Sequence, residues 1–212
     1  MAQVLCPVVV GRDVELVTLR AAAASALRGS GELVFLSGEA GVGKSRLVRE
    51  VMADTRARGA PVIMGRAVPT GVSTPYRPLA EALLQALRDR DVPDDADLAP
   101  WLPALGAILP TLSREGEGRI DDSPAIRGEA VLRLLRALAR PTGLVVVLED
   151  LHWSDPDTLA VVEYLGDNLA TAAVLCLATT RSEPRSGALD LVSRLHARRG
   201  RAGLGTVQRA VV

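Results

Sequence analysis

The sequence predicts an α/β fold, a three-layer α/β/α sandwich with a mainly parallel central sheet, from three observations. Continuous apolar runs at Leu33–Leu36, Leu144–Leu148 and Val174–Ala178 are typical of short strands that are buried on both faces of a sheet. Segments with helical character separate these runs. A glycine-rich turn lies between the first run and the helix that follows it. Strands that alternate with helices favour a parallel sheet with helices on both sides.

The first expected helix begins at Asp13, whose carboxylate can accept a backbone N–H bond as an N-cap. It should run to about Leu27, because Gly29 and Gly31 follow. This helix precedes the first strand.

The stretch GEAGVGKS, from Gly38 to Ser45, follows that strand and fits the pattern G-x-x-x-x-G-K-[ST]. Glycines let successive backbone N–H groups face phosphates, and the next helix presents the positive end of its dipole. Lys44, the only lysine in the chain, would contact the β- and γ-phosphates, and Ser45 would offer its hydroxyl to Mg²⁺. The alternative is a glycine-rich turn with an incidental lysine. We predict a P-loop NTPase fold whose phosphate-binding set is Gly38, Gly41, Val42, Gly43, Lys44, Ser45 and Arg46.

The helix after this loop should reach about Arg58, since Gly59-Ala60-Pro61 breaks it, and residues 61–65 then form a second strand. An amphipathic helix is expected near Leu79–Arg90. Residues 91–122 are expected to be irregular, with Trp101 and Leu105 as anchors and a mobile segment at 113–118. Ser123-Pro124 and Asp155-Pro156 each supply an N-cap and a first helical residue, for helices that run to Pro141 and to about Asn168.

Two carboxylates, Glu149 and Asp150, end the strand predicted at Leu144–Leu148. Ligands of open α/β sheets bind at the carboxyl ends of strands, so one acid would help to hold Mg²⁺ and the other would polarise the attacking water. Which acid does which is left open, and a solvated acidic turn is the alternative. Arg181 follows the strand at Val174–Ala178, where it would sense a γ-phosphate or simply be a surface arginine.

Four segments resemble the ATPase domain of STAND-class signalling NTPases, and more narrowly that of the large LuxR-type, MalT-like transcriptional regulators. They are VVGRDVELVTLRAAAASAL at Val9–Leu27, GEAGVGKSRLV at Gly38–Val48, VVVLEDLHWSDPDTL at Val145–Leu159 and LATTRSEP at Leu177–Pro184.

The resemblance implies a domain that binds ATP or ADP with Mg²⁺ and hydrolyses ATP slowly, as the switch of a signal-responsive transcriptional regulator. It places Gly11 and Arg12 near the adenine, makes Glu149 and Asp150 the Walker B acids, and makes Arg181 the sensor. Glu149 departs from the family, which more usually has Asp there. The partners it implies are nucleotide and either downstream regulator domains or another protomer.

We expect a single ATPase domain over 1–212, with the Gly-Arg box and first helix in 1–30, the nucleotide-binding core in 31–184 and an incomplete C-terminal part in 185–212. The last twelve residues do not predict the fifth strand or the lid of the family, which suggests a truncated chain. No helix-turn-helix can be placed, so no direct DNA binding is expected. The arginines of Arg181–Arg201 favour a solvated helix face over a nucleic-acid patch.

Composition excludes several classes. Formal net charge is zero and the pI is about 6.8, so no basic field indicates nucleic acid. Cys6 and Cys176 form no disulfide framework or metal spacing, which favours a reducing cytoplasm. Apolar runs are shorter than the roughly 20 residues of a spanning helix, so we expect neither export nor a membrane.

Two other functions stay open. A P-loop small-molecule kinase would need an acceptor pocket and an arginine clamp, and a non-catalytic nucleotide-binding fragment would act through protein interaction. His152 would orient a Walker B acid or be structural, and Trp153 favours an anchoring aromatic over an adenine stacker.

Overall fold

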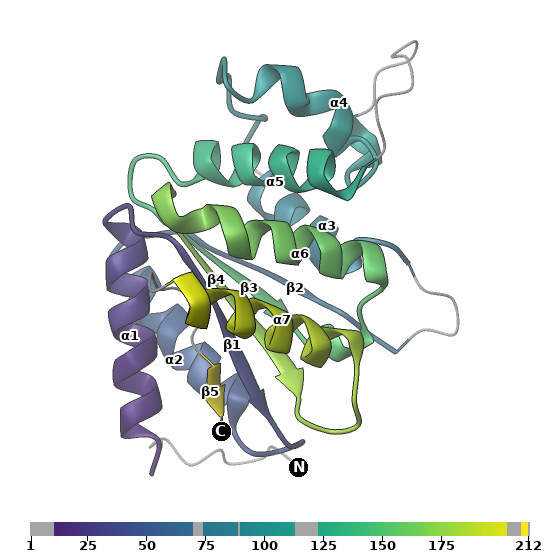
Figure 1. The fold of residues 1–212 in the computed structure, drawn as a ribbon. Helices are drawn as coiled ribbons and strands as arrows, with labels where there is room; N and C mark the ends of the chain where they lie inside the picture. Colours follow the sequence, from purple (N-terminus) through teal and green to yellow (C-terminus); the bar gives the residue numbers. More distant parts are fainter. Residues whose placement is uncertain (1–10, 70–73, 89, 113–122, 203–208, 212) are drawn as a thin grey trace, which may run out of the picture.

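The computed structural model describes residues 11–69, 74–88, 90–112, 123–202 and 209–211, which form a five-stranded sheet between two layers of helices (Figure 1). The strand order is β2-β3-β4-β1-β5, and every neighbouring pair is parallel. The strands are β1 (Glu32–Gly38), β2 (Val62–Arg66), β3 (Leu144–Glu149), β4 (Val174–Arg181) and β5 (Arg209–Val211). The predicted α/β fold is confirmed.

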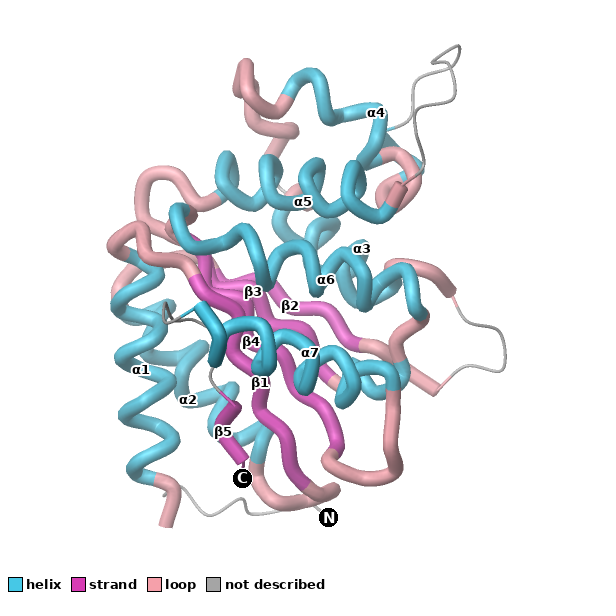
Figure 2. Tube along the Cα trace, viewed as in Figure 1, coloured by secondary structure: helices cyan, strands magenta, loops and turns pink. Residues whose placement is uncertain are grey.

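Helices cover both faces of the sheet, as Figure 2 shows. Alternate residues of β1 point to opposite layers: Val34 and Leu36 pack with α1 and α2, whereas Leu33 and Phe35 pack with the helices of the other layer. All seven residues of β1 are buried. The first layer holds α1 (Asp13–Leu27) and α2 (Lys44–Ala57), and the second holds α3 (Arg77–Ala86), α5 (Pro124–Leu138), α6 (Pro156–Asn168) and α7 (Gly187–Ala202).

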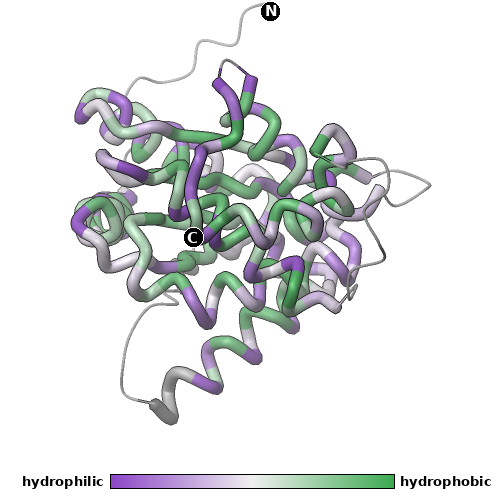
Figure 3. The backbone as a smooth tube through the Cα atoms, turned by 90° about the horizontal axis from the view of Figure 1, so that it is seen from above, coloured by the Kyte–Doolittle hydropathy of each residue, from purple (hydrophilic) through white to green (hydrophobic). Residues whose placement is uncertain are grey.

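Hydrophobic and hydrophilic residues are interspersed along the backbone (Figure 3). In α2 the buried Leu47, Val48, Val51 and Met52 recur at helical spacing, as expected for a helix with one face on a core. None of the described helices is both long enough and apolar enough to cross a membrane.

Two of the three expected helix caps are confirmed. The Ser123 hydroxyl accepts the Ile126 N–H at 3.4 Å, and the Asp155 carboxylate accepts the Thr158 N–H at 2.8 Å. Asp13 is not the cap that was predicted, because Arg12 occupies the N-cap position and makes no side-chain cap. Asp13 instead lies in the first turn, where a carboxylate faces the positive end of the helix dipole.

Between α3 and α5, the described residues contain one short helix, α4 (Leu102–Leu105), and two single 3-10 turns at Ala99–Trp101 and Pro110–Leu112. Leu105 is fully buried and Trp101 packs partly buried against the core, as predicted for anchors. The segment lies beside α5, away from the carboxyl ends of the strands (Figure 1). The mobile segment predicted at 113–118 falls outside the described residues.

One edge of the sheet is covered by side chains of α3. Strand β2 is the edge strand, and its outward N–H groups at Met64 and Arg66 donate to Gln85 at 2.7 Å and to Glu81 at 3.0 Å. Helix α3 also lies very close to Gly65, where an added Cβ would be 1.8 Å from the Pro78 carbonyl oxygen. A larger residue at this position would therefore push α3 off the strand.

The fifth strand corrects our expectation for the last twelve residues. Residues 209–211 pair parallel with β1, with Phe35 opposite Arg209. Backbone pairing needs no apolar run, and three residues are enough to occupy the edge of β1.

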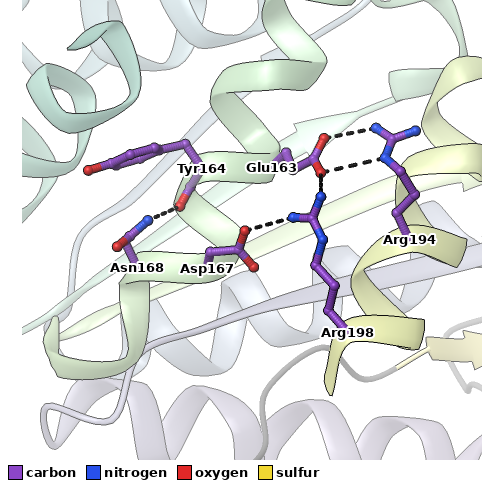
Figure 4. A network of polar contacts seen from close by, with 6 residues as sticks. All are labelled: Glu163, Tyr164, Asp167, Asn168, Arg194 and Arg198. Atoms are coloured by element: carbon purple, nitrogen blue, oxygen red, sulfur yellow. Dashed lines mark hydrogen bonds and ion pairs between the residues drawn. The ribbon is translucent and has the colours of Figure 1, made fainter. Parts of the chain in front are cut away.

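An ion-pair ladder joins α6 to α7 (Figure 4). Glu163 accepts from Arg194 at 2.8 Å and pairs with Arg198 at 2.6 Å, and Arg198 also reaches Asp167 at 3.0 Å. The hydrogen bond from Arg194 is the main cause that lowers the pKa of Glu163, although burial opposes it. Because the pKa of Glu163 is lower in the folded state than in the unfolded state, its ionised carboxylate stabilises the fold at pH values above the ordinary carboxyl pKa. This stabilisation is lost as the pH falls through the lowered, folded-state pKa.

We predict that Glu163→Gln lowers the free energy of unfolding by about 1 kcal/mol at pH 7, since two interhelical pairs are lost. The difference from the unmodified chain should shrink as the pH falls to about 3. Urea denaturation at several pH values measures it. Glu50→Gln is the matched control, because within the described part of the chain Glu50 pairs only inside α2, with Arg46 at 2.9 Å. An equal, pH-independent loss in both variants would contradict the prediction.

Candidate functional site

The carboxyl ends of neighbouring strands bring most of the predicted site residues to one edge of the sheet. Arg66 at the end of β2 is opposite Glu149 at the end of β3. Gly38 at the end of β1 is opposite Arg181 at the end of β4. Lys44 begins α2, directly after the loop that follows β1. Charged side chains of both signs, from four chain segments, thus lie along the edge formed by the carboxyl ends of the strands.

The glycine-rich loop has the backbone conformation that its glycines allow. Gly41 has φ +80° and Gly43, the N-cap of α2, has φ +103°, and both values lie in the left-handed region that disfavours side chains. The first N–H groups of an α-helix lack acceptors within the helix. The start of α2 therefore has the geometry of an anion-binding turn.

Lys44 folds back over this loop. Its side chain is buried, with 9% exposed, and Nζ donates to the carbonyl oxygens of Gly38 at 2.8 Å and Glu39 at 2.7 Å. An ammonium group has three donors, so the two carbonyls leave one for an anion. Burial lowers the pKa of Lys44, the negative charge of Asp150 opposes this, and Arg181 adds to it. Lys44 is thus placed at the loop and lies within electrostatic reach of both strand ends.

The two acids have different surroundings. Glu149 is 6% exposed and accepts from Arg66 Nη2 at 2.7 Å, whereas the side chain of Asp150 is 38% exposed and lies 3.6 Å from Arg66 Nε. Asp150 has φ +60°, and its N–H donates to Thr179 Oγ1 at 2.9 Å. This unusual backbone turns the Asp150 side chain out of the strand, while Glu149 stays in it.

Arg66 was missed by the sequence reasoning. The predicted second strand stopped at Gly65, one residue short, and no motif marks an arginine there. The signal that could have found it is the pairing of β2 with β3, which sets Arg66 opposite Glu149.

Arg181, His152 and Trp153 meet beside the acids. The guanidinium carbon of Arg181 lies 6.0 Å from the centre of the Trp153 ring, and the His152 and Trp153 rings are 5.0 Å apart. Trp153 is 46% exposed. Both ring nitrogens of His152 are buried without a hydrogen-bond partner among the described residues, and burial lowers the pKa of the imidazole. His152 therefore does not orient either acid through a hydrogen bond.

The other predicted contacts are placed less directly. Ser45 is exposed in the first turn of α2, and Arg46 is ion-paired with Glu50 along the same helix. Gly11 has φ +75° and Arg12 pairs with Glu15 at 3.0 Å. Helices α1 and α2 end beside the same hollow, lined by Leu27 and Arg58, so their starting residues also lie at a common end (Figure 1).

The residues fit a nucleotide with its metal better than a metal held by protein alone. No group of three or more His, Cys, Asp or Glu side chains in the described ranges could hold a metal ion. Mg²⁺ is commonly bound by one or two protein oxygens together with substrate phosphates. Ser45, next to Lys44 in α2, and Asp150, within electrostatic reach of Lys44, match that pattern.

Comparison with known proteins gives a family and one long relative. A model of the AAA ATPase domain matches residues 8–177. An uncharacterized protein of Rhizobium meliloti (strain 1021) is 30% identical over 201 residues, which cover 85% of this chain and 19% of that protein. The chain thus spans about a fifth of the length of this curated relative.

Solved structures of similar chains have low identity. The ORC2 protein of Aeropyrum pernix, in ADPNP-ADP complexes, is 14% identical with a TM-score of 0.44, covering 100% of this chain and 50% of that one. AMPPCP-bound DnaA of Aquifex aeolicus is 15% identical with a TM-score of 0.44, covering 95% and 47%. Drosophila ORC bound to DNA is 10% identical with a TM-score of 0.46, covering 93% and 89%. Likenesses of this size bear on neither activity nor partners.

We predict that Arg66→Ala lowers the free energy of unfolding by about 1–2 kcal/mol at pH 7, because the buried Glu149 loses its charged partner. In a double-mutant cycle with Glu149→Gln, the coupling energy should be about 1 kcal/mol. Denaturant unfolding of the four chains measures it, with Arg56→Ala, an exposed arginine of α2, as the control. Additive effects of the two substitutions would show that the pair does not stabilise the fold.

Proposed function

This chain belongs to the AAA ATPase domain family, and we propose that it binds Mg-ATP and hydrolyses it slowly, as the switch domain of a signal-responsive transcriptional regulator. The observation that carries the proposal is the set of charged residues at the carboxyl ends of the strands, where Lys44 lies at the glycine-rich loop within electrostatic reach of Asp150. The motifs that resemble LuxR-type, MalT-like regulators support the regulatory role. The greater length of the relative supports partners outside this chain, either downstream domains or another protomer.

The phosphate loop would bind the β- and γ-phosphates. The left-handed conformations of Gly41 and Gly43 would let backbone N–H groups of the loop face the phosphates, and Lys44 would add a positive charge there. Gly11 and Arg12, at the same end of the molecule, would contact the base.

The surroundings of the two acids support a division of roles. Asp150, turned outward and only loosely paired with Arg66, would hold Mg²⁺ together with the Ser45 hydroxyl. When bound, Mg²⁺ would neutralise charge on the phosphate oxygens. Glu149, buried and facing the same edge, would polarise the attacking water, and Arg181 would stabilise the charge of the γ-phosphate.

The ion pair with Arg66 supports slow turnover. The Glu149 oxygen that accepts the charge-assisted hydrogen bond from Arg66 at 2.7 Å is occupied by the guanidinium and not by water. The Glu149–Arg66 pair would have to open before Glu149 acts. This restraint suits a switch, whose occupied state must last, and it is also the observation that favours a non-catalytic nucleotide-binding domain.

We predict that Lys44→Ala weakens ATP binding at least tenfold, a loss of about 1.4 kcal/mol, because the charge at the phosphate loop is removed. Calorimetry with ATP and with ADP in Mg²⁺ measures the affinities. Arg58→Ala is the matched control, since it removes a cation from the opposite end of α2. If Lys44→Ala is folded by circular dichroism and binds ATP as well as the unmodified chain, the loop is not the phosphate site.

We also predict that the two acids respond differently. We expect Mg²⁺ to raise the ATP affinity of the unmodified chain about tenfold over the affinity in EDTA, and Asp150→Asn should lose most of this increase. Glu149→Gln should keep the increase but lose turnover. Binding is measured by calorimetry and turnover by phosphate release, with small-molecule acceptors added in parallel. If Glu149→Gln loses the effect of Mg²⁺ and Asp150→Asn loses only turnover, the roles of the two acids are exchanged. If no chain releases phosphate, the domain binds nucleotide without catalysis. Transfer of the γ-phosphate to an added small molecule would favour a kinase.

A further inference from the structure

Arg181 rests on an aromatic face rather than on an acid. Its guanidinium carbon lies 6.0 Å from the centre of the Trp153 ring, within the range of a cation–π interaction, and tryptophan is the strongest aromatic partner for a cation. No ion pair of Arg181 is found among the described residues, and its main chain is held separately, since the next residue, Ser182, donates its N–H to Gly38. The backbone of Arg181 is thus fixed, while the contact found for its guanidinium within the described residues is with the ring.

Trp153 is not placed as a core residue. Trp153 is 46% exposed, and it is one of four large hydrophobic side chains that are exposed in the described residues. Its indole ring lies beside Arg181 and the neighbouring His152. Trp153 lies in the 3-10 turn Leu151–Trp153 that follows β3, where an exposed indole contributes little to the core but can bind a cation on its face.

The charges around Arg181 explain why the ring is needed. Arg181 and Lys44 are close enough that each raises the local positive potential at the other, and burial makes the charge of Lys44 costly already. Without a phosphate between them, the guanidinium and the lysine repel each other, and the negative charge of Asp150 offsets part of this repulsion. A terminal phosphate would reverse this, because it accepts charge-assisted hydrogen bonds from both groups, which are stronger than the hold of an exposed ring.

We propose that Trp153 is a positioning residue that holds the Arg181 guanidinium at the rim of the phosphate site and releases it to a γ-phosphate, so that the site distinguishes triphosphate from diphosphate. This inference rests on the proposed nucleotide binding. The Trp153 ring competes with the terminal phosphate for the same cation. ADP, which has no γ-phosphate, leaves Arg181 on the ring.

The first test uses tryptophan fluorescence, because the chain has two tryptophans, Trp101 and Trp153. Trp101 directly precedes α4, a helix that lies away from the carboxyl ends of the strands (Figure 1). In Trp101→Phe, AMPPCP with Mg²⁺ should change the emission of Trp153, and ADP should change it much less. Adding Arg181→Gln should abolish the difference between the nucleotides. Trp153→Phe, which leaves Trp101 as the reporter, should respond to neither.

The second test measures affinity by calorimetry. Trp153→Leu removes the competing ring, so AMPPCP should bind about 2–5 times more tightly while ADP affinity stays unchanged. Trp153→Phe keeps an aromatic face and should lie between the unmodified chain and Trp153→Leu. A merely structural tryptophan would instead weaken both nucleotides alike.

The outcomes distinguish failure of the Trp153 positioning role from failure of nucleotide binding. If AMPPCP binds by calorimetry but Trp153 emission does not respond, or responds equally with Arg181→Gln, the positioning role is wrong and nucleotide binding stands. If Trp153→Leu weakens both nucleotides equally, the role is likewise overturned. If the unmodified folded chain binds neither nucleotide, the proposed function fails and this inference fails with it.

Discussion

Both faces of the parallel sheet are covered, and the rest of the molecule depends on this constraint. A strand packed between two helical layers cannot carry charged side chains along its length, so polar groups are confined to the strand ends. Because the strands are parallel, those ends meet at one edge. The concentration of charge around Lys44 is a consequence of this packing, and the glycine-rich loop only shapes it.

Charged residues of both signs follow one another along that edge, with the acids between Arg66 and the two neighbouring cations Arg181 and Lys44. Arg66 on β2, the acids on β3, Arg181 on β4 and Lys44 after β1 follow the spatial order of the strands. The arrangement gives each cation a different restraint: Arg66 is bound by acids, Lys44 by loop carbonyls, and Arg181 by an aromatic ring. The three restraints differ in strength, so an incoming anion would meet cations that yield in a definite order, with Arg181 first.

Much of this was predictable from the sequence, because apolar runs, capping residues and the glycine pattern act locally. The strands, the helices and the cap at Ser123 follow from short stretches of sequence. The features that the sequence did not predict depend on pairing between distant segments. Arg66 belongs to the site because β2 pairs with β3 and sets it opposite Glu149, and residues 209–211 form a strand because they pair with β1. The exposure of Trp153 and its contact with Arg181 arise from two strand ends that are remote in sequence.

The covering of β2 by α3 has a consequence for assembly. Gln85 and Glu81 occupy the N–H groups that an approaching strand would need, so this edge resists β-sheet pairing with another molecule, and the charged Glu81 adds to the deterrent. The sheet is thereby closed to extension on the side of β2, and any strand added to it would have to join at the opposite edge, beside β5.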